Sequence, residues 1–69
     1  MLTIKAVYTP TREEIFEAQR VRTVPDEGGA LLNVLFQPAD GDHEIGIWAQ
    51  DCVIYVMNDK GRTIAVYGG

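Results

Sequence analysis

VIYVMNDKGRTIAVY, residues Val53 to Tyr67, is the stretch of this sequence that decides the fold. Two runs of β-branched and aromatic residues flank a polar loop that contains Gly61, and this pattern is typical of a β-hairpin. If Gly61 closes the turn, one face carries Ile54, Val56, Ile64 and Val66, and the other carries Val53, Tyr55, Met57, Ala65 and Tyr67. Both faces are apolar. Because a chain of 69 residues builds one core, the second apolar face predicts a partner.

The rest of the chain is predicted to add further short strands to this hairpin. Leu2–Thr9 alternates between apolar and polar residues, as a half-buried strand does. Ala30–Gln37 is apolar on both sides, which indicates a central buried strand. Glu44–Ala49 is predicted to be another strand, with Trp48 on the side opposite its inward isoleucines.

The segment from Arg12 to Val24 fits two different structures. Thr11 followed three residues later by Glu14 matches a capping box, and EEIFEAQR consists mostly of good helix formers. The apolar residues of the segment nevertheless form a poor helical stripe, and RVRTV alternates as a strand does. We favour a long strand paired with the first one.

The spacing of the strands indicates the fold class. Turn signals recur about every eight to twelve residues, which is typical of a small antiparallel barrel or sandwich. We therefore predict one all-β domain over residues 1–69, with about five to six strands in a barrel or sandwich. The alternative is an α+β domain with a helix at about residues 11–20.

Composition narrows the classes of function. Ten acidic residues against six basic ones give a net charge of −4, so we expect no direct binding to nucleic acid. Cys52 is the single cysteine, which excludes an intrachain disulfide and favours a reducing, cytoplasmic compartment. The longest apolar run, Val53–Met57, is too short to cross a bilayer, and the start of the sequence has no secretory pattern.

No catalytic or ligand-binding motif is evident. His43 lies in the acidic segment DGDHE, but four adjacent ligands in a turn do not converge on one metal ion. Cys52 and His43 are the one thiol–imidazole pair, and only proximity in sequence would make Asp51 the third group that orients such a base. We expect no cofactor, no metal and no enzymatic activity.

Aromatic and charged side chains supply the candidate contact residues. Tyr55, Met57 and Tyr67 form the preferred contact surface, on the hairpin face without the isoleucine and valine cluster, and Trp48 is a further candidate. Arg20 and Arg22 lie on one side of a strand and would suit an anionic ligand such as a nucleotide phosphate. The more favoured interpretation of these arginines is pairing with Glu13, Glu14 or Glu17 on the neighbouring strand or turn.

A third group of candidates is acidic. The carboxylates that could mimic a phosphate backbone are Asp40, Asp42 and Glu44. Solvation of an exposed loop is the favoured interpretation of this cluster.

EIFEAQRV, together with the terminal VIYVMNDKGRTIAVY, resembles small uncharacterised accessory proteins of tailed bacteriophages. The similarity covers the strand Ile15–Val21 and the hairpin Val53–Tyr67, about a third of the chain, and departs between Pro25 and Asp51. It implies a compact protein that occupies a host protein, and it assigns no catalytic or binding residue.

Three functions follow as hypotheses. The first is a non-enzymatic protein-binding module, a phage-type inhibitor of a host enzyme or defence complex. The alternatives are an oligomer that sequesters a small anionic ligand and a structural or assembly component of a virion. We also expect a homodimer at micromolar concentration through Tyr55, Met57 and Tyr67, with Tyr67→Asp weakening it without loss of the fold.

Overall fold

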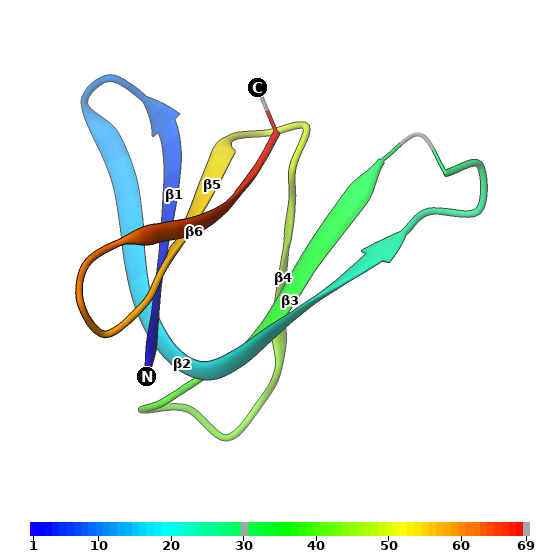
Figure 1. Ribbon diagram of the computed structural model, residues 1–69. Helices are drawn as coiled ribbons and strands as arrows, with labels where there is room; N and C mark the ends of the chain where they lie inside the picture. Colours follow the sequence, from blue (N-terminus) through cyan, green and yellow to red (C-terminus); the bar gives the residue numbers. More distant parts are fainter. Residues whose placement is uncertain (30, 69) are drawn as a thin grey trace.

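The computed structural model describes residues 1–29 and 31–68, which form a six-stranded sheet with no helix among them (Figure 1). The strands are β1 (Leu2–Thr9), β2 (Arg12–Pro25), β3 (Leu32–Pro38), β4 (Ile45–Trp48), β5 (Val53–Met57) and β6 (Thr63–Tyr67). Their order in the sheet is β4-β3-β2-β1-β5-β6, and all neighbours are antiparallel. The predicted all-β class is therefore confirmed. No helix in the described part of the chain is long and apolar enough to span a membrane.

The ambiguous segment is the strand β2, so the alternative of a helix at residues 11–20 is wrong. The predicted strand Ala30–Gln37 corresponds to β3, which begins at Leu32; Ala30 lies outside the described residues.

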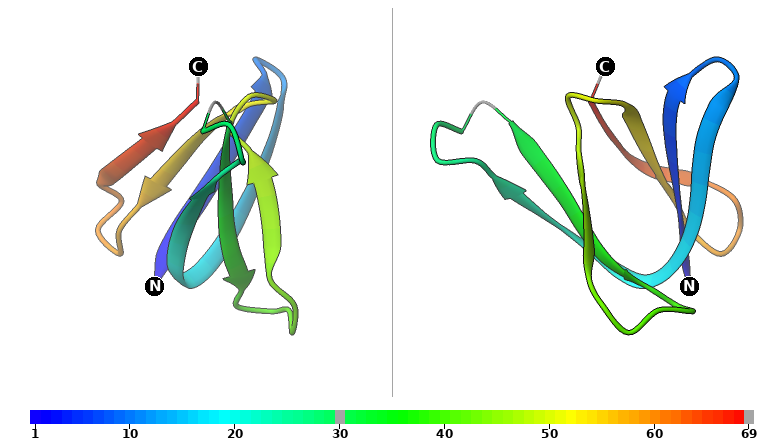
Figure 2. Two further views of the ribbon diagram at one scale, coloured as in Figure 1. Left: turned by 90° about the vertical axis from the view of Figure 1, so that its right-hand side faces the viewer. Right: turned by 180° about the vertical axis from the view of Figure 1, so that it is seen from behind.

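β2 is long enough to pair with strands in both halves of the sheet. Its first part pairs with β1, from Thr9↔Arg12 to Leu2↔Ala18, and its second part pairs with β3. The register shifts between Ala18 and Val21: Ala18 pairs with Pro38 and Val21 pairs with Phe36, so β2 has one residue more than β3 over this stretch. An extra residue of this kind bends a strand and increases its twist. Figures 1 and 2 show the result: β2 curves sharply, and the sheet folds into two halves that face each other.

The core lies on the inner face of this folded sheet. Alternation puts Val34 and Phe36 of β3 inward, and the ring of Phe36 lies 5.2 Å from that of Phe16 on β2. The buried residues that form the core are Ile4, Ala6, Ala18, Val34, Phe36, Ile47, Ala49, Cys52, Ile54 and Val56. Every strand from β1 to β5 contributes to this list, so the inner face is already filled by the protein itself.

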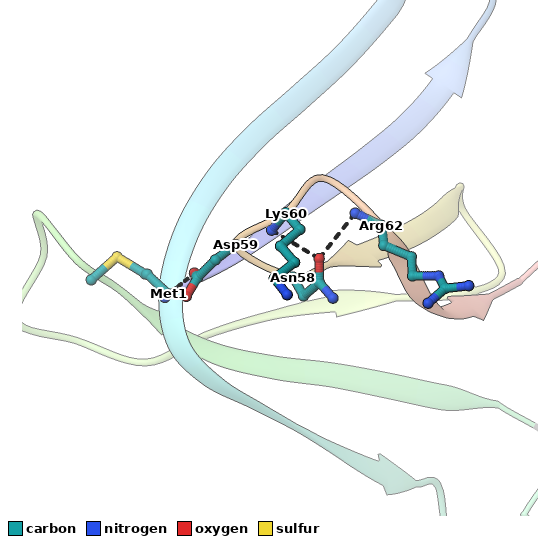
Figure 3. Close-up of polar contacts among 5 residues, drawn as sticks. All are labelled: Met1, Asn58, Asp59, Lys60 and Arg62. Atoms are coloured by element: carbon teal, nitrogen blue, oxygen red, sulfur yellow. Dashed lines mark hydrogen bonds and ion pairs between the residues drawn. The ribbon is translucent and has the colours of Figure 1, made fainter.

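The β5–β6 turn is closed as the sequence predicts. Asn58 Oδ1 accepts hydrogen bonds from the backbone N–H groups of Lys60 and Arg62, each at 3.0 Å (Figure 3). Gly61 adopts a φ of +78°, a left-handed conformation that glycine takes at little cost. An asparagine that bonds its own turn and a left-handed glycine together account for the hairpin.

The predicted faces of the hairpin are wrong on the β6 side. Tyr67 lies opposite Ile54 and packs against the core, whereas Val66 lies opposite Tyr55. The cause is a register shift at the turn end of β6, where Ile64 is one extra residue. Because side chains alternate, one extra residue moves everything beyond it to the other face. Tyr67 therefore lies on the inner face, partly buried against the core, and does not share the face of Tyr55 and Met57.

Candidate functional site

The outer face of β2-β1-β5-β6 is the main candidate surface. Across these four strands, directly opposed residues place Ile15, Lys5, Tyr55 and Val66 in one row. Opposed residues in a sheet share a face, so this row defines a surface on the side away from the core. On either side of the row, Val7 pairs with Val53 and Thr3 pairs with Met57. We call this surface the outer face, formed by Lys5, Val7, Ile15, Val53, Tyr55, Met57, Ile64 and Val66.

The outer face exposes branched apolar side chains. Ile15 is 60% exposed, Ile64 55% and Val66 54%. Tyr55 and Met57 lie on β5, between β1 and β6, and are half-buried. Single exposed apolar residues are normal on a protein surface, but three on one face of a small sheet make that face a candidate for a contact.

A charged pair interrupts the apolar residues. Lys5 Nζ lies 3.3 Å from Glu13 Oε2, and both side chains are partly exposed. They line a shallow hollow of about 290 Å³ together with Val7, Tyr55 and Met57. The aliphatic stem of Lys5 adds apolar area while its ammonium group stays with the acid. An apolar surface with one charged pair is typical of a protein contact whose polar groups fix the orientation of the partner.

The structure brings together only part of the predicted contact set. Tyr55 and Met57 lie on the outer face, whereas Trp48, 37% exposed, lies on β4 at the other end of the sheet. Trp48 is opposite Asn33, whose Oδ1 is buried and has no hydrogen-bond partner among the described residues. Ile15 is the residue that the sequence interpretation missed. The sequence does indicate its position, because side chains alternate along a strand and Ile15 therefore lies on the face opposite to that of Phe16 and Ala18.

Arg22 forms the best-defined ion pair on the surface. Its Nε donates to Glu44 Oε2 at 3.0 Å and its Nη2 to Glu44 Oε1 at 2.7 Å. These hydrogen bonds lower the pKa of the Glu44 carboxyl and raise the pKa of Arg22. The predicted pairing of Arg22 with Glu13, Glu14 or Glu17 is therefore wrong. The register shift after Ala18 puts Arg22 beside Leu35 on the β3 side, away from those acids.

An open hollow of about 610 Å³ lies beside this ion pair, where β2 bends. Arg20, Arg22 and Glu44 line it together with Leu35 and Gln37. Both arginines thus lie at the same hollow, as their placement on one side of a strand predicts. The neighbouring carboxylate of Glu44, however, offsets the positive charge that an anionic ligand would need.

The acidic candidates lie in the loop between β3 and β4. Asp40, Asp42 and Glu44 are all exposed. Glu44 is held by Arg22, and Asp42 Oδ1 lies 3.4 Å from His43 Nε2. The loop therefore presents the carboxylates of Asp40 and Asp42 more freely than that of Glu44.

Cys52 and His43 are not brought together. They lie beyond opposite ends of β4, with His43 exposed and Cys52 buried. Burial, followed by the negative charges of Asp51 and Glu14, raises the pKa of the Cys52 thiol. Among residues 1–29 and 31–68, no three or more histidine, cysteine, aspartate or glutamate side chains are grouped so that they could hold a metal ion.

Comparisons with protein-family models, with curated proteins and with solved structures found no match to this chain. The basis for a functional proposal is therefore the geometry and chemistry of the outer face, the arginine hollow and the acidic loop.

Proposed function

We propose that this protein is a non-enzymatic protein-binding module that holds its partner on the outer face. The observation that supports this proposal is the second apolar surface: the inner face is filled by the core, yet Ile15, Ile64 and Val66 stay more than half exposed. Apolar side chains left outside a completed core gain free energy when a partner covers them.

A protein partner would cover a large part of so small a protein. A stable interface covers about 800 Å² on each partner, a substantial share of the 4764 Å² that the protein exposes. Fully burying one large apolar side chain contributes about 1.5–3 kcal/mol, and aromatic residues near the centre of a contact contribute most. Tyr55 occupies such a central place, between Lys5 and Val66 in the row.

Within this class, we favour an inhibitor of the phage type that occupies a host enzyme or defence complex. The net charge of −4 favours a basic partner, because opposite charges speed encounter and disfavour wrong partners. Asp40 and Asp42 would add to this field from the loop before β4. A structural component of a virion would use the same surface, and finding the protein in purified particles would favour that alternative.

Sequestration of an anionic ligand has less support. Arg22 already donates two hydrogen bonds to Glu44, so a phosphate group would have to displace a carboxylate. Thermal-shift measurements against a panel of nucleotides test this alternative, and an unchanged melting temperature would remove it.

Capture from a bacterial lysate, compared between two matched variants, tests the proposed function. Ile15→Lys puts a charge on the outer face, and Val24→Lys puts the same charge on β2 opposite Asn33, outside that face. We expect the wild type and Val24→Lys to retain one stoichiometric protein and Ile15→Lys to lose it. Equal retention by both variants, or no stoichiometric partner beside reproducible turnover of a small substrate, would contradict the proposal.

A further inference from the structure

β6 is an edge strand without the usual protection. It ends the sheet, and no further strand lies beside it within the part of the chain that the structure describes. Edge strands commonly carry lysine, proline or an inward charge that prevents pairing with another chain. Thr63–Tyr67, which reads TIAVY, has neither a charged residue nor a proline, and Ile64 and Val66 are more than half exposed.

The sequence of β6 is complementary to itself. If two copies pair antiparallel around Ala65, Ile64 of each copy lies opposite Val66 of the other, and Ala65 lies opposite its own counterpart. Thr63 then lies opposite Tyr67. Opposed β-branched side chains stabilise a sheet, and no like charges face each other in this register.

The other edge of the sheet does not have this property. β4 (Ile45–Trp48, IGIW) has four residues against five in β6, and pairing of two copies centred between Gly46 and Ile47 would set Ile47 of each copy opposite a glycine. Glycine weakens a strand because it has no side chain to pack against its neighbour. Strand length and side-chain pairing therefore favour the β6 edge over the β4 edge.

We propose that β6 pairs with β6 of a second copy around Ala65, which joins two sheets into one of twelve strands, six from each copy. A two-fold pairing closes on itself, so it yields a dimer and no longer assembly. The two outer faces then lie in one continuous sheet, and the dimer presents two copies of the proposed contact surface. The inference goes beyond the proposed function, because it concerns the β6 edge and does not require a foreign partner.

Sedimentation of two matched variants tests whether the dimer forms at this edge. Ile64→Lys and Ile15→Lys make the same change at residues of similar exposure; both residues lie on the outer face, but Ile64 also lies on the edge strand, whereas Ile15 lies three strands from β6. We expect the wild type and Ile15→Lys to form dimers at micromolar concentration. Ile64→Lys should raise the dimer dissociation constant about tenfold or more and sediment near the monomer mass of 7.7 kDa.

Three sedimentation results would overturn the pairing. They are a wild type that stays monomeric, loss of the dimer in Ile15→Lys, and oligomers that keep growing with concentration. Loss of lysate capture in Ile15→Lys with the dimer intact would separate the two proposals, since Ile15 lies on the outer face but not on the β6 edge.

Disulfide trapping tests the register and does not depend on the folding of a charged variant. A mixture of Ile64→Cys and Val66→Cys should cross-link to each other faster than either does to itself, because those positions are directly opposed. Wild-type protein is the control, since its one cysteine, Cys52, is buried. Faster self-cross-linking of Val66→Cys, or no cross-link in the mixture, would overturn the proposed pairing.

Discussion

Gly68 is the residue at which one methyl group would disturb the fold most directly. It has a φ of +90°, and a Cβ built on it would lie 2.4 Å from the carbonyl oxygen of Cys52 and 2.5 Å from that of Ala49. Gly61 is its natural control, because its φ is also positive while a Cβ there meets nothing within 4 Å. The two glycines thus separate the cost of the left-handed backbone from the cost of a steric clash.

We expect Gly61→Ala to lower the free energy of unfolding by about 1 kcal/mol, the cost of a left-handed non-glycine residue. Gly68→Ala should lower it by about 3 kcal/mol or more, since the clash with two backbone oxygens adds to the same strain. Urea denaturation followed by circular dichroism measures both. Equal losses in the two variants would mean that the loop between β4 and β5 moves away without cost.

The Arg22–Glu44 pair makes a prediction about pH. Hydrogen bonds from Arg22 lower the pKa of the Glu44 carboxyl, so Arg22→Met should raise that pKa towards its ordinary value. A carboxyl whose pKa is lower in the folded state stabilises the protein above its unfolded-state pKa, and this stabilisation is lost as the pH falls through the folded-state pKa. A carboxyl ¹³C titration by NMR measures the shift directly. An unchanged pKa in Arg22→Met would contradict the ion pair.

At the scale of elements, two of the register shifts, those in β2 and β6, decide on which face later side chains lie. The shift in β2 turns Arg22 towards the β3–β4 side, and the shift in β6 puts Tyr67 on the inner face, partly buried against the core. In each case one strand has a single extra residue relative to the strand with which it pairs. The consequences of these shifts are not local, because every later side chain of the strand changes face.

The placement of Tyr67 reverses the expectation for Tyr67→Asp. A carboxylate there would enter the inner face beside Ile54, so we expect a loss of about 1–3 kcal/mol in the free energy of unfolding. Tyr55→Asp, on the outer face, should leave the stability nearly unchanged and weaken partner capture instead. Urea unfolding and lysate capture of both variants provide the comparison. A Tyr67→Asp protein as stable as the wild type would contradict the observed register.

Most of the elements could be predicted from the sequence, because alternation and turn residues are local signals. The strands, the Gly61 turn and the buried side of β3 all follow from patterns of a few residues. The partner of Arg22 and the face of Tyr67 could not be predicted in this way. They depend on where a strand gains an extra residue, which strand pairing decides and no short pattern in this chain marks. Of the residues predicted to share one face of the hairpin, Tyr55 and Met57 do share it, Tyr67 lies on the opposite face, and Ile15 on β2 was not predicted to lie beside them.

At the scale of the whole molecule, one core must hold two facing halves of a small sheet. Phe36 on β3 is 1% exposed, and its ring meets that of Phe16, which lies on the part of β2 that pairs with β1. This ring contact spans the bend of β2. A domain of this size has a stability of about 3–10 kcal/mol, estimated from 0.05–0.15 kcal/mol per residue. Removing one large aromatic ring from the core costs about 3–5 kcal/mol, a large fraction of that total.

We therefore expect Phe36→Ala to lower the free energy of unfolding by about 3–5 kcal/mol and to melt well below the wild-type temperature. Ile15→Ala, which removes a side chain that is 60% exposed, should change the free energy of unfolding by less than about 0.5 kcal/mol. Circular dichroism during thermal unfolding distinguishes the two variants. If Phe36→Ala melted cooperatively near the wild-type temperature, the two halves of the sheet would be held together by β2 and the loops, and not by packing across the bend.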